Sequence, residues 1–98
     1  MMYARVTIAQ VQPGKTGEGV SIVRDSVLPA AKQQKGFKGL LQLTDPATGK
    51  AITVTLWETK ADLDAGEASG YYQAQLAIAA ALLTGPPVHE IYEVSVQA

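Results

Sequence analysis

Apolar and polar residues alternate along several short stretches of the chain, a pattern typical of β-strands with one buried face. The alternation predicts four strands, at residues 3–11, 37–44, 51–58 and 88–97. Pro13-Gly14 is a turn signal after the first strand, and residues 45–50 form a turn-rich hairpin loop between the second and the third.

The segment between the first two strands has apolar residues at helical spacing, which predicts a helix over residues 18–34. Its single apolar stripe consists of Val20, Val23, Val27, Leu28 and Ala31. Pro29 lies inside this helix and predicts a kink or an early end, because proline has no N–H to donate to Asp25. Gly36 is a favourable residue for ending the helix.

A second helical region follows the third strand. Thr59 and Asp62 resemble a capping box at its start, and Gly66 and Gly70 interrupt it. A short helix followed by a longer one is therefore expected, ending at Gly85-Pro86-Pro87. One face of the longer helix consists of Tyr72, Leu76, Ala79 and Leu83.

The predicted order is β-α-β-β-α-β, the order of a ferredoxin-like α+β sandwich. Right-handed crossovers place both helices on one face of a four-stranded antiparallel sheet. Each crossover skips a neighbouring strand, so the first and third strands should be central. The 98 residues form one predicted domain, 1–98.

The alternation separates two faces of this sheet without assigning them. In the third strand the two sets are Ile52, Val54 and Leu56, and Thr53, Thr55 and Trp57. Either set could face the helices, since a one-residue slip exchanges the faces. The uncovered face still carries one of these sets, Leu40 or Leu41, and Ile91. So much exposed apolar surface favours packing against a second sheet, and a homodimer is expected.

The composition narrows the function classes. The chain is 47% hydrophobic and 17% charged, as in globular proteins, and its net charge of −1 comes from mixed charges that do not suit nucleic acid. With no cysteine and one histidine, the usual metal sites and thiol catalysis are excluded. No segment has the length or pattern of a membrane span or a signal peptide, so a cytoplasmic protein without a membrane partner is expected.

The aromatic residues of the second half are the first candidates for a ligand pocket. Trp57 offers a flat apolar wall and one N–H donor, or it packs in the core or an interface. Tyr71 and Tyr72 are adjacent on a helix and face different directions. Tyr72 continues the apolar stripe, whereas Tyr71 presents its hydroxyl to a pocket or to solvent.

Two ionisable residues are further candidates. His89 is the one side chain that titrates near neutral pH without perturbation, so it is the candidate general base, although an edge-strand histidine is more often a surface residue. Arg5 on a central strand must be paired or solvated. Pairing with Glu93 or Glu58 at the dimer face and binding of an anionic ligand are its two interpretations.

Four motifs together resemble the antibiotic-biosynthesis-monooxygenase-like family of the dimeric α/β barrel superfamily. They are the strand 52–58, the helix start 59–63, the step 69–72 and the end of the first strand, 11–15. The resemblance covers essentially the whole chain. It implies a ferredoxin-like protomer whose sheet packs face to face with that of a second copy.

The resemblance also implies candidate activities. Characterised members of the family include cofactor-free oxygenases of polycyclic phenols and haem-degrading enzymes, both with a tryptophan where this chain has Trp57. Many members have a histidine where this chain has Gly66, and haem-degrading members use an asparagine on the first strand, which this chain lacks. The haem activity is therefore disfavoured.

The first hypothesis is a cofactor-independent oxygenase of a small phenolic or quinone-like molecule, with no metal or cofactor. Trp57, Tyr71, Tyr72 and Arg5 would bind the aromatic ligand, and His89 would be its catalytic base. The alternative is a non-catalytic small-ligand binder or a structural homodimer of the same fold.

Overall fold

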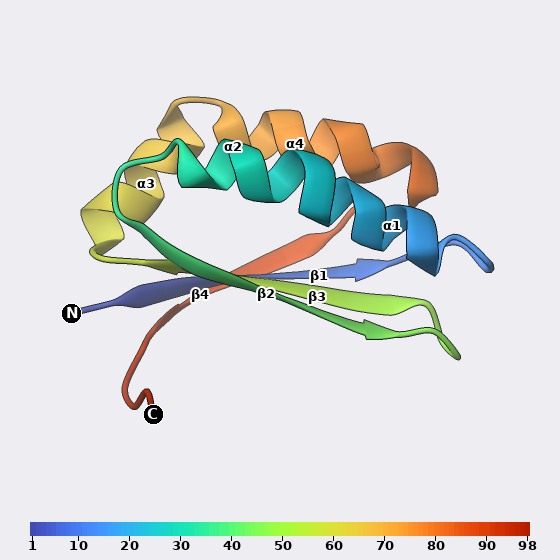
Figure 1. The fold of residues 1–98 in the computed structure, drawn as a ribbon, viewed down its shortest axis with the longest axis horizontal. Coiled ribbons are helices and arrows are strands. Elements are labelled where there is room, and N and C mark those ends of the chain that lie inside the picture. The colour runs from blue at the N-terminus through green and yellow to red at the C-terminus, as the bar shows by residue number, and fades with distance from the viewer.

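The structure, a computed structural model that describes residues 1–98, is a two-layer α+β sandwich (Figure 1). Its four strands are β1 (Tyr3–Gln10), β2 (Phe37–Asp45), β3 (Lys50–Trp57) and β4 (Val88–Glu93). They form one antiparallel sheet in the order β2-β3-β1-β4. All helices cover one face of the sheet, and the other face is bare (Figure 1). The predicted ferredoxin-like fold, with β1 and β3 central, is confirmed.

The first helical region is continuous but irregular. It consists of α1 (Thr16–Ile22), the π-helical turn η1 (Val23–Val27) and α2 (Leu28–Lys32). The wider turn comes directly before Pro29, which cannot donate the regular helical hydrogen bond. The predicted irregularity at Pro29 is therefore present as a π-helical turn. The chain leaves the helix through Gly36, whose φ of +81° suits glycine.

The second helical region contains α3 (Lys60–Ala68), α4 (Tyr71–Ala79) and the 3₁₀ turn η2 (Ala80–Leu82). The Thr59 hydroxyl oxygen accepts the backbone N–H of Asp62 at 3.1 Å, so Thr59 caps α3 as predicted. Gly70, at φ +84°, separates the two helices. α3 and α4 have nine residues each, and η2 makes the second piece the longer one.

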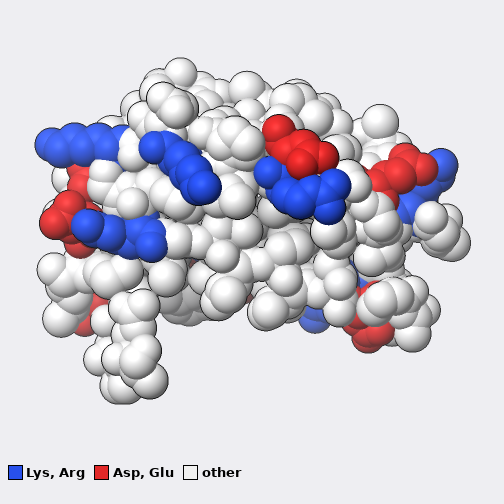
Figure 2. Space-filling model, in the orientation of Figure 1, with Lys and Arg blue, Asp and Glu red and all other residues white.

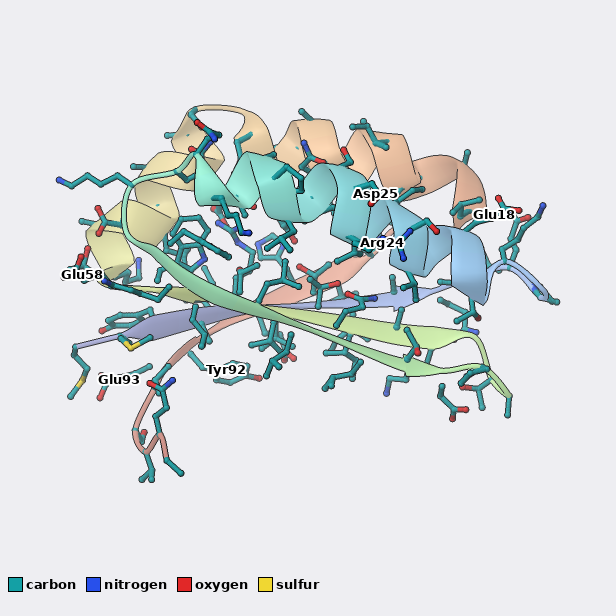
Figure 3. All side chains as sticks on the ribbon, viewed as in Figure 1. Glu18, Arg24, Asp25, Glu58, Tyr92 and Glu93 are labelled. Carbon is teal, nitrogen blue, oxygen red and sulfur yellow. The ribbon has the colours of Figure 1, made fainter.

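The register of the strands assigns the two faces of the sheet. Arg5 pairs with Thr55, and Thr7 with Thr53, and these four side chains lie under the helices. The bare face is mainly apolar and carries Val6, Ile8, Leu41, Leu43, Ile52, Val54, Leu56, Val88 and Tyr92, with Glu90 between the last two on β4. Figure 3 shows Tyr92 on this side, pointing away from the helices.

Ile91 lies on the opposite face of the sheet from the one predicted. Ile91 pairs with Arg5 in register and so shares the helix-covered face, whereas its neighbour Tyr92, 50% exposed, takes the outer position. The prediction placed β4 one residue out of phase because alternation in an edge strand does not fix its register.

The compact core lies at the end of the sandwich where α3 packs. Trp57, Leu63 and Arg5 are its largest fully buried side chains. The Phe37 ring lies edge-on to the indole of Trp57, with centroids 5.7 Å apart.

Charged groups of both signs lie on the visible surface, separated by uncharged area (Figure 2). None of the helices is both long enough and apolar enough to cross a membrane.

Candidate functional site

Between the sheet and the helices, beyond the core, lies a cavity of about 100 Å³. Its floor is formed by sheet residues with polar or small side chains, namely Arg5, Thr7, Ala9, Gln42, Ala51, Thr53 and Thr55. Its roof is formed by apolar residues of the helical layer, namely Val20, Val23, Val27, Leu76 and Ala79 from helices and Leu83 just after η2. Threonine and alanine leave this space open because they are shorter than the leucine and isoleucine of the bare face.

Arg5 is the one charged residue that lines the cavity, and it is only 1% exposed. Its Nε lies 3.2 Å from Oε1 of Glu67, and its Nη2 donates to the Leu63 carbonyl at 3.2 Å. Its guanidinium carbon is 4.0 Å from the ring centroid of Tyr72, within the range of a cation–π interaction. The predicted partners, Glu93 and Glu58, are wrong, because α3 brings Glu67 over the inner face.

The guanidinium of Arg5 has N–H donors to spare. It carries five donors, and the fold provides Glu67 and Leu63 as its partners. No fully buried side-chain nitrogen lacks a partner. Because Arg5 lines the cavity, its remaining donors are candidates to bind an anionic or carbonyl oxygen there. The position of Arg5 on the inner face also excludes the predicted pairing at an outer dimer face.

Tyr71 and Tyr72 both line the cavity. The Tyr72 hydroxyl lies 2.7 Å from that of Thr7, which fixes its ring over the floor. Burial raises the pKa of Tyr72, and its hydrogen bond with Thr7 and the charge of Arg5 only partly oppose this. Burial likewise raises the pKa of Tyr71. Both side chains are therefore neutral phenols at physiological pH and can donate or accept a hydrogen bond.

Trp57 lies on the same inner face of the sheet, in the core where α3 packs, and does not line the cavity. The indole is completely buried, and its Nε1 donates to the Thr55 hydroxyl at 3.0 Å. A Cβ on Gly66 would lie 3.7 Å from the indole, so the aromatic ring occupies the space beside this glycine. Trp57 thus holds Thr55 and packs in the core, and it contributes no wall to this cavity; a ligand contact by Trp57 stays a prediction.

His89 also lies outside the cavity lining. Its side chain is 44% exposed, and its Nε2 is 3.8 Å from Oε1 of Glu67. Its ring packs edge-on against Tyr72, with centroids 5.4 Å apart. His89 therefore contacts a lining residue, Tyr72, without lining the cavity itself, and its role as a general base stays a prediction.

Two glutamines in the cavity wall were not predicted as site residues. Gln42 on β2 accepts a hydrogen bond from the Thr53 hydroxyl at 2.5 Å, and Gln75 on α4 accepts one from the Ser26 hydroxyl at 2.9 Å. Gln42 was missed because its face could not be assigned from alternation alone. A polar residue at a helix-facing strand position would have been the signal.

Comparisons with curated proteins give relatives of unknown activity. No family model matches the chain. The uncharacterised protein Rv2558 of Mycobacterium tuberculosis is 36% identical over 83 residues, which are 85% of this chain and 34% of that protein. The uncharacterised Rv2557 of the same organism is 37% identical over 59 residues, 60% of this chain and 26% of that protein. The chain thus spans about a third or less of the length of the curated relatives it matches.

Solved structures give clear matches over the whole chain. SnoaB, a cofactor-independent oxygenase from Streptomyces nogalater, aligns with a TM-score of 0.81 at 15% identity, covering 98% of this chain and 95% of SnoaB. The Streptomyces coelicolor monooxygenase ActVA-Orf6, solved with nanaomycin D, gives 0.79 at 16% identity, with coverages of 98% and 89%. A Nitrosomonas europaea protein provisionally described as an antibiotic biosynthesis monooxygenase gives 0.77 at 18% identity, with coverages of 96% and 90%. The chain has the antibiotic biosynthesis monooxygenase fold.

The resemblance read from the strand 52–58 and its companion motifs is thus confirmed at the level of the fold. Within the antibiotic biosynthesis monooxygenase fold, this chain places Arg5, Tyr71 and Tyr72 around one cavity. Trp57 and His89 are not among the residues that line it. Because folds host many functions, the activity has to be argued from the site itself.

Proposed function

We propose that the chain is a cofactor-independent oxygenase of a small phenolic or quinone-like molecule that binds in the cavity over Arg5. The observation that carries this proposal is the character of the cavity. It has an apolar roof, a polar floor and a buried arginine as its one charged lining residue. Such a site suits a planar aromatic ring with an ionised oxygen. The description of SnoaB as a cofactor-independent oxygenase supports the same chemistry on this fold.

The size of the cavity limits the substrate. A water molecule needs roughly 10–15 Å³ measured in this way, so the cavity of about 100 Å³ has room for roughly seven to ten of them. One ring or two fused rings fit this space better than three or more. A naphthol is therefore a better probe than an anthrone.

The reaction requires little from the protein. A phenol reacts with O₂ to give the quinone and water. The ring carbon opposite the hydroxyl loses hydrogen and gains one oxygen atom, and the other oxygen atom leaves as water with both protons. The substrate supplies all four electrons that O₂ takes up, so no further reductant is required. The protein need only hold the phenolate and keep water away.

The residues of the cavity meet these two needs. The spare N–H donors of Arg5 stabilise the negative charge of the phenolate before its first electron moves to O₂. Tyr71, Leu76 and the valines of the roof provide flat, apolar contacts for the ring. No aspartate, glutamate, histidine or lysine lines the cavity. The charge of Arg5 would favour ionisation, with the proton passing to water.

Oxygen uptake tests this function. Purified protein is mixed with 1-naphthol, a panel of one-ring phenols and an anthrone, and O₂ consumption and quinone formation are followed against autoxidation. We expect uptake of one O₂ per quinone, fastest with 1-naphthol. Arg5→Lys should lower kcat/KM about tenfold or more, because the lost charged hydrogen bonds contribute about 1.5–3 kcal/mol.

Two further variants make the result specific to the cavity. Arg24→Lys changes an exposed arginine that pairs with Asp25 on the outer surface of the helices (Figure 3), and it should leave the rate unchanged. Ala51→Leu fills the floor without changing charge and should abolish turnover. Uptake that survives both Arg5→Lys and Ala51→Leu would overturn the proposed site.

A non-catalytic small-ligand binder is the second candidate. It is favoured by the lack of a general base in the cavity lining, since His89 contacts Tyr72 but does not line the cavity. Binding of a naphthol or naphthoquinone without any O₂ consumption would identify this function. The same cavity would then serve for storage or sensing of the ligand.

We expect a homodimer whichever of these two functions the protein has. The bare face of the sheet carries Leu41, Leu43, Val88 and Tyr92 at half exposure or more. Monomeric proteins rarely leave so continuous an apolar surface in water. We expect two copies to pack these faces together, with each cavity on the far side of its own sheet.

A further inference from the structure

We infer that Gln42 and Gln75 select a ligand with hydrogen-bond acceptor oxygens at both ends of its ring, such as a 1,4-quinone. This inference deepens the proposed function, on whose cavity it rests. It concerns two uncharged polar residues of the cavity lining. The two amides approach the cavity from different layers of the sandwich, Gln42 from β2 of the sheet and Gln75 from α4.

The orientation of each amide follows from its neighbour. The Thr53 hydroxyl donates to Oε1 of Gln42, and the Ser26 hydroxyl donates to Oε1 of Gln75. With both carbonyls occupied, the NH₂ groups are the free ends of the two side chains. Neither NH₂ group has a partner in the fold, and no fully buried side-chain nitrogen lacks one. Because both residues line the cavity, we assign these free donors to it.

The cavity thus presents donors from opposite sides. Arg5 lies on β1 and Gln42 on β2, with β3 between them. Adjacent strands are about 4.8 Å apart, so the backbones of these two residues are about 10 Å or more apart across the sheet. A ring with oxygens at opposite ends, flanked by two hydrogen bonds of about 2.9 Å, spans such a width.

Three of the other hydroxyl groups of the cavity already have partners, whereas the Tyr71 hydroxyl can either donate or accept. The Thr7 and Tyr72 hydroxyls bond each other, and the Thr55 hydroxyl accepts from Trp57. A ligand without a second oxygen would leave the amide donors of Gln42 and Gln75 without a partner. Sites built to bond a ligand oxygen discriminate strongly against analogues that lack it. The 1,4-quinone product of a naphthol would accordingly bind more tightly than the naphthol itself.

A pair of neutral probes tests this inference. 1,4-Naphthoquinone and 1-naphthol share a skeleton and differ in the second oxygen. The chain has no cysteine for the quinone to alkylate, and its one tryptophan, Trp57, reports binding through fluorescence quenching. Titrations are done under argon, so that no oxidation occurs. We expect the quinone to bind about tenfold more tightly, as one or two hydrogen bonds of about 1 kcal/mol each imply.

Substitutions of the two glutamines test whether their amide groups cause the preference for the quinone. Gln42→Leu and Gln75→Leu should each reduce the quinone-to-naphthol affinity ratio to threefold or less, while the affinity for 1-naphthol changes little. Gln73→Leu, on the exposed side of α4, is the matched control and should keep the full ratio. Equal affinities in the unaltered protein, or a ratio that survives both substitutions, would overturn the inference.

The two proposals fail separately in these experiments. If the affinity ratio depends on Gln42 and Gln75 but no oxygen is consumed, the proposed oxygenase activity is wrong and the inference about the two amides stands. If oxygen uptake depends on Arg5 but the quinone-to-naphthol affinity ratio is unaffected by substitution of Gln42 or Gln75, the inference about the amides is wrong and the proposed oxygenase activity stands.

Discussion

At the scale of single residues, the burial of Arg5 is the most consequential feature. Its counter-charge comes from Glu67, which is 28% exposed. Glu67→Gln keeps a hydrogen-bond acceptor but leaves the guanidinium without an opposite charge. The free energy of unfolding, measured by urea denaturation, should fall by about 1–3 kcal/mol. Water reaching Glu67 keeps the effect below that of a fully buried pair.

A second carboxylate on the same helix provides the control for this prediction. Asp64 pairs with Lys60 at 2.9 Å, and both side chains are about half exposed. Asp64→Asn should change the stability by less than about 0.5 kcal/mol, as is usual for surface ion pairs. Equal losses in Glu67→Gln and Asp64→Asn would show that Arg5 needs no special counter-charge.

Only part of this residue-level picture could be predicted from the sequence. Arg5 on a central strand indicates a need for a partner, but Glu67 lies 62 positions away and meets it only through the packing of α3. The same limit applies to Trp57. Its size predicts a buried or ligand-contacting residue, and the choice between the two depends on Thr55, which accepts its N–H and itself lines the cavity.

At the scale of elements, the turn at Gly36 joins the first helical region to β2 and holds it beside α3. Gly36 has a φ of +81°, and a Cβ there would collide with the carboxylate of Asp62. Gly36→Ala should therefore lower the free energy of unfolding by more than the roughly 1–2 kcal/mol of the left-handed conformation alone. Gly14 has a φ of +77° and open space around it, so Gly14→Ala measures the cost of the left-handed conformation without a collision. Urea unfolding of Gly14→Ala and Gly36→Ala compares them, and equal losses would rule out the collision.

Element positions followed well from the pattern, and the exceptions have physical causes. The strands alternate, and Thr59 caps its helix through the predicted threonine hydroxyl. β4, however, ends at Glu93 although residues 94–97 continue to alternate. Its partner β1 begins at Tyr3, so that beyond Glu93 the sheet offers only one more hydrogen bond, from Val94 to Met2. Alternation describes side chains and does not show where the neighbouring strand ends.

At the scale of the whole molecule, the sheet turns its more polar face toward its own helices. Thr7, Thr53 and Thr55 face inward, while Ile8, Ile52 and Val54 face outward. A monomer would be expected to bury the aliphatic set, and the sequence could not decide between the two arrangements. The arrangement has a physical explanation if a second copy covers the aliphatic set, because the polar interior is then free to hold a ligand.

This explanation predicts the mass of the particle and its response to a single charge. Sedimentation equilibrium at micromolar concentrations should give twice the chain mass of 10.3 kDa. Leu43→Lys, at 50% exposure on the bare face, should give the monomer mass, because a desolvated lysine without a partner opposes association. Ile78→Lys, at 49% exposure on α4, adds the same charge to an equally exposed apolar position on the helical side and should leave the dimer intact. A monomeric unaltered chain, or equal dissociation by both substitutions, would mean that something other than a second copy of this sheet covers the aliphatic face.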